Sequence, residues 1–141
     1  MSERARYDHF TPQRVRYSEI DAQGIVFNAH YLTYYDITIT EYLRALRYDY
    51  DGMVRKSGLD FHLVKALVEY QRPIVKDSEI EVGITVGRIG TTSLTWVLAI
   101  FLKGEDEVLA TGELVWVCSK VGAHKSHALP AELVGLLGRK A

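Results

Sequence analysis

The stretch YLTYYDITITEYLRALRY, residues 31–48, decides the fold class of this chain. Its tyrosines and aliphatic residues recur at three-, four- and seven-residue spacing, which is typical of one face of a helix. Residues 36–40 instead alternate like a strand and carry β-branched side chains, which helices tolerate poorly. Because about eighteen residues without Gly or Pro are long for a strand and ordinary for a helix, we predict one long helix here. Burial rather than intrinsic propensity would stabilise it.

Strand patterns dominate the remainder of the chain. Five segments are predicted as strands: residues 13–18, 63–71, 79–86, 94–103 and 108–119. Residues 94–103 are apolar on both alternating faces, which is typical of a central strand covered on both sides. Residues 129–137, with Pro130 in the first turn, predict a short C-terminal helix.

One long helix against an antiparallel sheet of about five strands predicts an α+β fold, in a single domain spanning residues 1–141. The second face of the central strand needs a further cover, and the sequence offers no second long helix for it. We therefore expect a second copy of the chain to cover this face, so the protein is predicted to be a homo-oligomer.

Composition excludes several classes of function. The 141 residues include 17 basic and 18 acidic side chains, so a net charge of −1 gives no general attraction to nucleic acid or anionic lipid. The first residues are charged, and the longest uncharged run, residues 89–102, is too short and too rich in Gly and Thr to cross a bilayer. We therefore expect a cytoplasmic protein that neither binds nucleic acid nor inserts into a membrane.

The sequence motifs of common nucleophile, nucleotide and zinc sites are absent. His124 and His127 lie three residues apart in a basic loop without a Cys or acidic ligand nearby, so we expect no metal site. We also expect no cofactor. Cys118 lies in an apolar strand without a neighbouring His and is expected to be buried rather than nucleophilic.

Asp21, in the stretch SEIDAQGIVFNAH at residues 18–30, is the candidate catalytic residue. Asp three residues before Gly24 is also the usual composition of a simple turn. However, a helix that begins near Asn28 offers unpaired N–H groups, which can stabilise the oxyanion formed when a carbonyl is attacked. A carboxylate on the adjoining loop could attack that carbonyl or deprotonate a water. The pair favours acyl transfer, with thioesters as suitable substrates.

The stretch DAQGIVFNAHYL, residues 21–32, resembles the signature of the 4-hydroxybenzoyl-CoA thioesterase family of hotdog-fold proteins. VEYQRP at residues 68–73, followed by Asp77, and GTTSL at residues 90–94 resemble two further motifs of that family. The likeness extends to the tail at residues 128–130 and is greatest to the short acyl-CoA thioesterases linked to the Tol-Pal system. It covers most of the chain.

The resemblance implies a hotdog fold, in which an antiparallel sheet wraps a long helix, and dimers or tetramers with sites at subunit interfaces. It implies that Asp21 is the catalytic carboxylate and that the backbone N–H of Asn28 is the oxyanion donor. Many relatives have His where this chain has Asn28, and Glu-x-x-Arg where it has Asp36 and Ile39.

Two sets of residues are candidates for substrate binding. Near the acyl group we expect Gly24, Ile25, Val26, Tyr31 and Tyr35, although packing of the helix on its sheet explains these residues equally well. For the phosphates of coenzyme A we expect Arg88, Lys120 and Lys125, since phosphate capture needs cations or free N–H groups.

We therefore predict an acyl-CoA thioesterase that releases a carboxylic acid and free coenzyme A, with Asp21 as nucleophile or general base. One alternative is a hotdog hydratase or dehydratase, whose His-based motif is not found in this sequence. Another is a non-catalytic module that binds acyl-CoA. The sequence leaves open the acyl group, the thiol carrier (coenzyme A or acyl carrier protein) and the choice of dimer or tetramer.

Overall fold

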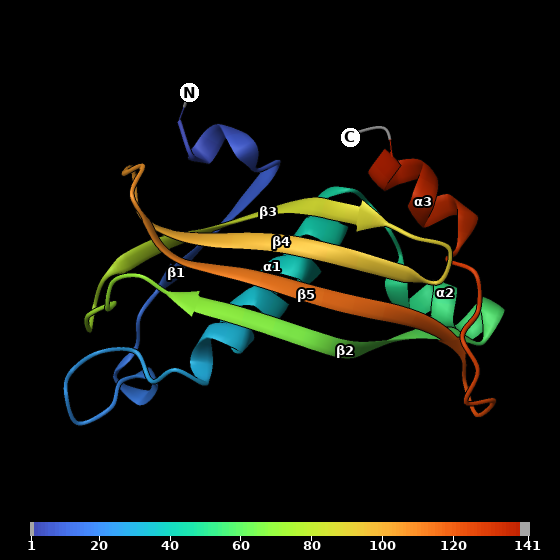
Figure 1. Cartoon of the computed structure of the whole chain (residues 1–141), viewed down its shortest axis with the longest axis horizontal. Coiled ribbons are helices and arrows are strands. Elements are labelled where there is room, and N and C mark those ends of the chain that lie inside the picture. Colours follow the sequence, from blue (N-terminus) through green and yellow to red (C-terminus); the bar gives the residue numbers. More distant parts are fainter. Residues whose placement is uncertain (1, 139–141) are drawn as a thin grey trace.

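The computed structural model describes residues 2–138, and its central feature is a five-stranded antiparallel sheet (Figure 1). The strands lie in the order β1-β3-β4-β5-β2, so β1 and β2 form the two edges. Their bounds are β1 His9–Arg14, β2 Leu59–Tyr70, β3 Glu79–Ile89, β4 Ser93–Leu102 and β5 Val108–Lys120. The helices are α1 His30–Ala45, α2 Tyr50–Ser57 and α3 Ala131–Gly138, and short 3-10 helices span Arg4–Arg6 and Tyr17–Glu19.

Helix α1 crosses one face of the sheet (Figure 1), and its buried side forms the core with the inner side chains of the strands. Tyr35 approaches β5 closely, because a Cβ at Gly112 would lie only 2.4 Å from the Tyr35 ring. The buried hydroxyl of Thr38 donates a 2.8 Å hydrogen bond to the backbone oxygen of Tyr34, one turn earlier. This bond satisfies the buried hydroxyl, and burial of the apolar face stabilises a helix that contains β-branched residues, so the predicted long helix is confirmed.

The end of the predicted helix differs from the structure. Helix α1 stops at Ala45, and Arg47 adopts a left-handed φ of 58°. A second helix, α2, follows, and the sequence pattern did not predict it. The Asp49 side chain caps it by accepting a 3.0 Å hydrogen bond from the Gly52 N–H, and Gly58 ends it with a φ of 70°.

Four predicted strands are confirmed with shifted ends, and the one at residues 13–18 is wrong. Strand β1 lies earlier, and Tyr17–Glu19 forms a 3-10 turn instead. Pro12 is tolerated in β1 because that strand is an edge. Strand β2 begins four residues before the predicted start, and a bulge between Leu63 and Lys65 interrupts its alternation.

The outer face of β4 is covered in part by the chain itself. Phe101 and Ala99 are fully buried there, and the rings of Tyr7 and Phe10 each meet the Phe101 ring edge-on, with 5.9 Å between ring centroids. The expectation that a second copy supplies the whole cover is therefore wrong for this end of the strand.

The long helix against a five-stranded antiparallel sheet confirms the predicted α+β, hotdog arrangement. Within residues 2–138, none of the helices combines the length and hydropathy needed to cross a bilayer.

Candidate active site

Asp21 lies in a tight turn between the 3-10 helix Tyr17–Glu19 and α1. Its backbone oxygen accepts a 3.0 Å hydrogen bond from the Gly24 N–H, and Gly24 has a φ of 79°. One carboxylate oxygen of Asp21 accepts a 2.8 Å hydrogen bond from the Gln23 N–H. The other has no hydrogen-bond donor among the described residues. The turn interpretation is thus right for the local backbone, and the turn leaves one carboxylate oxygen free.

The loop that carries Asp21 is held on the segment after β2. The Val26 N–H donates a 2.8 Å hydrogen bond to the Ile74 oxygen, and the Lys76 N–H donates a 3.2 Å bond to the Gly24 oxygen. An isolated β-bridge pairs Ile25 with Val75 on the same segment. These backbone contacts hold the end of the turn and the residues that follow it on this segment.

A free backbone donor lies just before helix α1, next to this loop. The Tyr31 N–H donates to the Asn28 oxygen at 3.4 Å, and the Tyr70 hydroxyl donates to the same oxygen at 3.1 Å. The N–H of Asn28 itself has no acceptor among residues 2–138. An unpaired amide at the start of a helix is a donor that can bind a carbonyl oxygen or an oxyanion.

Asp21 and Asn28 line the same cavity, which has a volume of about 340 Å³. The other lining residues are Gln23, Ile25, Val26, Tyr31, Tyr70, Gln71, Arg72 and Pro73. The rings of Tyr31 and Tyr70 meet edge-on with centroids 4.7 Å apart, and burial raises the pKa of Tyr31, which keeps it neutral. The cavity therefore combines a carboxylate, a free amide and an apolar wall.

Two candidates for the acyl pocket lie outside this cavity. Tyr35 is fully buried against Gly112, and burial raises its pKa far above the ordinary value. Gly24 shapes the turn and does not line the cavity. Conversely, the sequence reasoning missed Tyr70, Gln71 and Arg72 as site residues, although all three belong to the VEYQRP motif at residues 68–73.

The three cations expected at the phosphates lie far from Asp21 in one copy of the chain. Lys120 pairs with Leu59 in the sheet, whereas Tyr70, beside the cavity, pairs with Ala110. Ten residues along β5 separate these points by about 33 Å. Arg88 pairs with Thr95, which pairs with Val115 on β5, so Arg88 also lies toward the Lys120 end of the sheet. Lys125 lines a separate hollow of about 470 Å³ with Lys120, His62 and His124.

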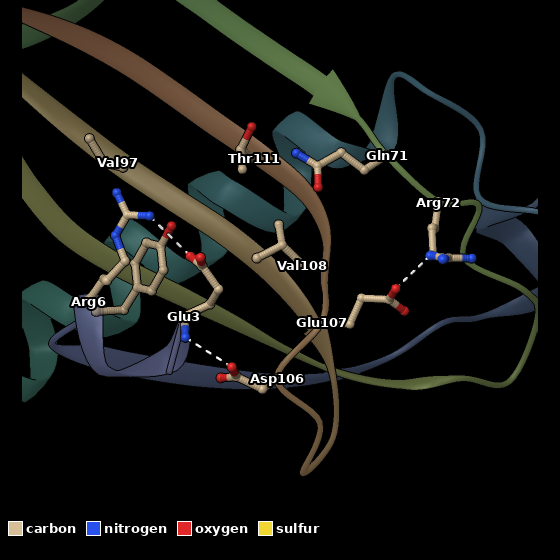
Figure 2. A pocket seen from close by; sticks show the side chains of 10 residues that line it. Glu3, Arg6, Gln71, Arg72, Val97, Asp106, Glu107, Val108 and Thr111 are labelled. Carbon is tan, nitrogen blue, oxygen red and sulfur yellow. Dashed lines mark hydrogen bonds and ion pairs between the residues drawn. The ribbon is translucent and has the colours of Figure 1, made fainter. Parts of the chain in front are cut away.

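Arg72 is the basic residue that does line the Asp21 cavity. Together with Gln71 it also lines a larger hollow of about 640 Å³ on the outer side of the sheet. Figure 2 shows both side chains at the end of β2, with Glu107 pointing toward Arg72. The Arg72 Nε atom lies 2.7 Å from a Glu107 carboxylate oxygen, and the pair is well exposed. The two hollows therefore meet at Arg72.

Other candidate groups take no part in this site. Cys118 is fully buried, as predicted, and burial raises the pKa of its thiol. The His127 Nδ1 atom donates a 2.7 Å hydrogen bond to the backbone oxygen of Ala128. Within the part of the chain that the structure describes, no three His, Cys, Asp or Glu side chains are grouped to hold a metal ion.

Known proteins share both sequence and fold with this chain. The sequence model of the protein family described as "Thioesterase superfamily" matches residues 23–110. The acyl-CoA thioester hydrolase YbgC of Escherichia coli O6:H1 is 30% identical over 123 residues, which are 87% of this chain and 90% of that protein. A crystal structure from Pseudomonas aeruginosa strain PAO1 has a TM-score of 0.84 and 29% identity, covering 96% of this chain and 93% of the other. One from Aquifex aeolicus has a TM-score of 0.83 and 28% identity, with 92% and 99% covered.

Proposed function

Because this chain belongs to the thioesterase superfamily and is a thioester hydrolase, we propose that it cleaves acyl-CoA thioesters to a carboxylic acid and free coenzyme A. The resemblance to 4-hydroxybenzoyl-CoA thioesterases holds at the level of this superfamily. The narrower family is not confirmed.

One observation supports the proposed chemistry most strongly: the free carboxylate oxygen of Asp21 and the free amide of Asn28 line one cavity. The thioester oxygen would accept a hydrogen bond from the Asn28 N–H, which stabilises the developing oxyanion. As nucleophile, Asp21 attacks the carbonyl carbon, the thiolate leaves, and water cleaves the resulting anhydride. As general base, it takes a proton from the water that attacks the same carbon. Both routes yield the acid and the thiol.

We assign the acyl group to the wall formed by Ile25, Val26, Tyr31 and Tyr70. The thiol carrier would leave the cavity past Arg72, whose guanidinium can bind a phosphate. Within one copy of the chain, we therefore propose Arg72 as the phosphate contact in place of Arg88, Lys120 and Lys125.

We further propose that the enzyme is a homo-oligomer built on the edge strand β2. Its side chains Leu63, Val64, Leu67 and Tyr70 are between 43% and 59% exposed, which is unusual for large apolar residues on one strand. Two β2 strands related by a two-fold axis pair antiparallel, so the Leu59 end of one lies beside the Tyr70 end of the other. Lys120 and Lys125 of a second copy would then lie toward the Asp21 cavity of the first.

Light scattering on a sizing column tests the assembly. Leu67→Arg should shift the protein toward the monomer, whereas Tyr17→Arg, which changes a 77% exposed side chain on the 3-10 helix Tyr17–Glu19, outside β2, should not. A wild-type protein that is monomeric at micromolar concentration would contradict the proposal.

Thiol release from a panel of acyl-CoAs tests the activity. The hydratase alternative predicts hydration of an enoyl-CoA without thiol release. The binding-module alternative predicts that a non-hydrolysable thioether analogue binds while no member of the panel is cleaved.

A further inference from the structure

A buried carboxylate, Glu19, lies beneath the loop that connects Asp21 to α1. The Glu19 residue is only 6% exposed, and its Oε1 atom accepts two hydrogen bonds, from the Arg16 N–H at 2.9 Å and the Tyr34 hydroxyl at 2.8 Å. Its Oε2 atom accepts from the Arg16 guanidinium at 3.0 and 3.2 Å. The chemistry described above uses none of these groups.

The Glu19 backbone spans the same loop from the other side. Its oxygen accepts a 2.9 Å hydrogen bond from the Phe27 N–H, and a bridge pairs Ile20 with Val26. Glu19 precedes Asp21 by two residues, and Phe27 immediately precedes Asn28. One residue therefore joins the two ends of the loop through its backbone and joins the loop to α1 through its side chain.

A charged carboxylate at this depth is costly unless it is fully hydrogen-bonded. Burial alone would raise the pKa of Glu19, but the hydrogen bonds from the Arg16 N–H, the Tyr34 hydroxyl and the Arg16 guanidinium outweigh it and hold the pKa below its ordinary value. Burial, with a further contribution from Glu19, also raises the pKa of Tyr34 far above its usual range. Glu19 is thus an anion and Tyr34 is a neutral donor.

We propose that Glu19 and Tyr34 are positioning residues, which set the place of the Asp21 carboxylate relative to the Asn28 amide. The proposal rests on the function proposed above. Tyr34 lies in the second turn of α1, and Asn28 lies two residues before the start of that helix, so the Glu19–Tyr34 bond connects the helix directly to the loop entry. Without it, the loop and the helix start can shift relative to each other while the core stays packed.

The two carboxylate oxygens of Glu19 bind different donors, so a substitution at residue 19 can remove the charge and still keep the hydrogen bonds at Oε1. Gln at this position can place its carbonyl oxygen where Oε1 lies and keep both bonds to Arg16 N–H and Tyr34. Its amide would face the Arg16 guanidinium, which is 67% exposed and can turn to solvent. Ala keeps neither bond.

We expect Tyr34→Phe and Glu19→Ala to lower kcat by about 10- to 100-fold with KM within twofold, as for a small displacement of reacting groups. Glu19→Gln should retain kcat within about threefold of the wild type. Glu41→Gln, which changes the carboxylate of an exposed ion pair with Arg44 on α1, should leave both parameters unchanged. Tyr48→Phe, which removes a buried hydroxyl without a partner among the described residues, is the control for Tyr34→Phe.

Amide hydrogen exchange supplies a readout that does not need activity. In Tyr34→Phe the Phe27 amide should exchange at least tenfold faster, while amides in the centre of β4 keep their protection. Normal kcat in Tyr34→Phe, or unchanged Phe27 exchange, would overturn the positioning role. So would an equal loss of kcat in Glu19→Gln and Glu19→Ala. If no acyl-CoA is cleaved, or if Asp21→Asn is fully active, the proposed function is wrong instead. Amide hydrogen exchange in Tyr34→Phe then still tests whether the Glu19–Tyr34 hydrogen bond holds the loop.

Discussion

The Tyr70 hydroxyl donates a 3.1 Å hydrogen bond to the backbone oxygen of Asn28. This bond links the last residue of β2 to the start of α1, and it fixes the peptide that follows Asn28. The strand end and the helix start therefore form one site, although 42 residues separate them in the sequence.

Tyr70→Phe should lower kcat/KM for acyl-CoA hydrolysis by about two- to tenfold, the equivalent of one net hydrogen bond of about 0.5–1.5 kcal/mol. The ring remains and still meets Tyr31, so the apolar wall is kept. Steady-state kinetics of the two proteins provide the measurement. Full activity would show that the hydroxyl does not orient the helix start.

Asp21→Asn should reduce kcat by about 10²- to 10⁴-fold because the amide is neither a nucleophile nor a base of useful strength. The Gln23 N–H can still donate to the Asn oxygen, so the melting temperature should stay close to that of the wild type. Asp36→Asn, an exposed change on α1, serves as the control. Unchanged thiol release by Asp21→Asn would refute its catalytic role.

Arg72→Ala should raise KM about three- to tenfold for an acyl-CoA and leave KM unchanged for the matching N-acetylcysteamine thioester, which has no phosphate. Arg14→Ala, which breaks another exposed ion pair, with Glu79, should affect neither substrate. An equal rise of KM for both thioesters would place Arg72 in contact with the acyl end instead.

Gly112→Ala should destabilise the protein by about 1–3 kcal/mol, since the added Cβ would overlap the Tyr35 ring at 2.4 Å. Gly135→Ala in α3 is the control, because nothing beyond the neighbouring residues and the backbone of the same helix lies within 4 Å of its added Cβ. Urea unfolding of both variants gives the comparison. If Gly112→Ala unfolds at the wild-type midpoint, the ring does not hold β5 and α1 this closely in solution.

The hydrogen bonds that lower the pKa of Glu19 also predict a pH dependence of stability. The carboxyl of the unfolded chain titrates near 4.5, and that of the folded chain titrates lower. The contribution of Glu19 is therefore complete above pH 4.5 and is lost as the pH falls through the folded pKa. Urea unfolding between pH 3 and 7 should show a shallower acid-side decline for Glu19→Gln than for the wild type. Parallel curves would exclude Glu19 as the source of the decline.

Local patterns predicted the long helix and most strands because these elements bury a regular apolar face. Helix α2 was missed because its eight residues are mostly polar and include Gly52, so only Asp49 and Gly58 marked its ends. The position of β1 was wrong because Val15 and Tyr17 continue the alternation beyond the true strand end. Periodicity carries no information on which of two alternating stretches finds a pairing partner.

The candidate site was partly predictable for a different reason. Asp21 and Asn28 are close in sequence, so a loop and a helix start sufficed to bring them together. Arg72 reaches the cavity only through the end of β2, and Lys120 is kept from it by the direction of β5. Such relations depend on strand order, which no local pattern in this chain specifies.

The bulge between Leu63 and Lys65 lies near the middle of the open edge of the sheet. Another strand can add to this edge in only a few registers, because its hydrogen bonds must match β2 on both sides of the bulge. The charged side chain of Lys65 also disfavours edge-to-edge addition of further strands. The edge is thereby suited to close once against a matching surface and resists growth into an endless ribbon.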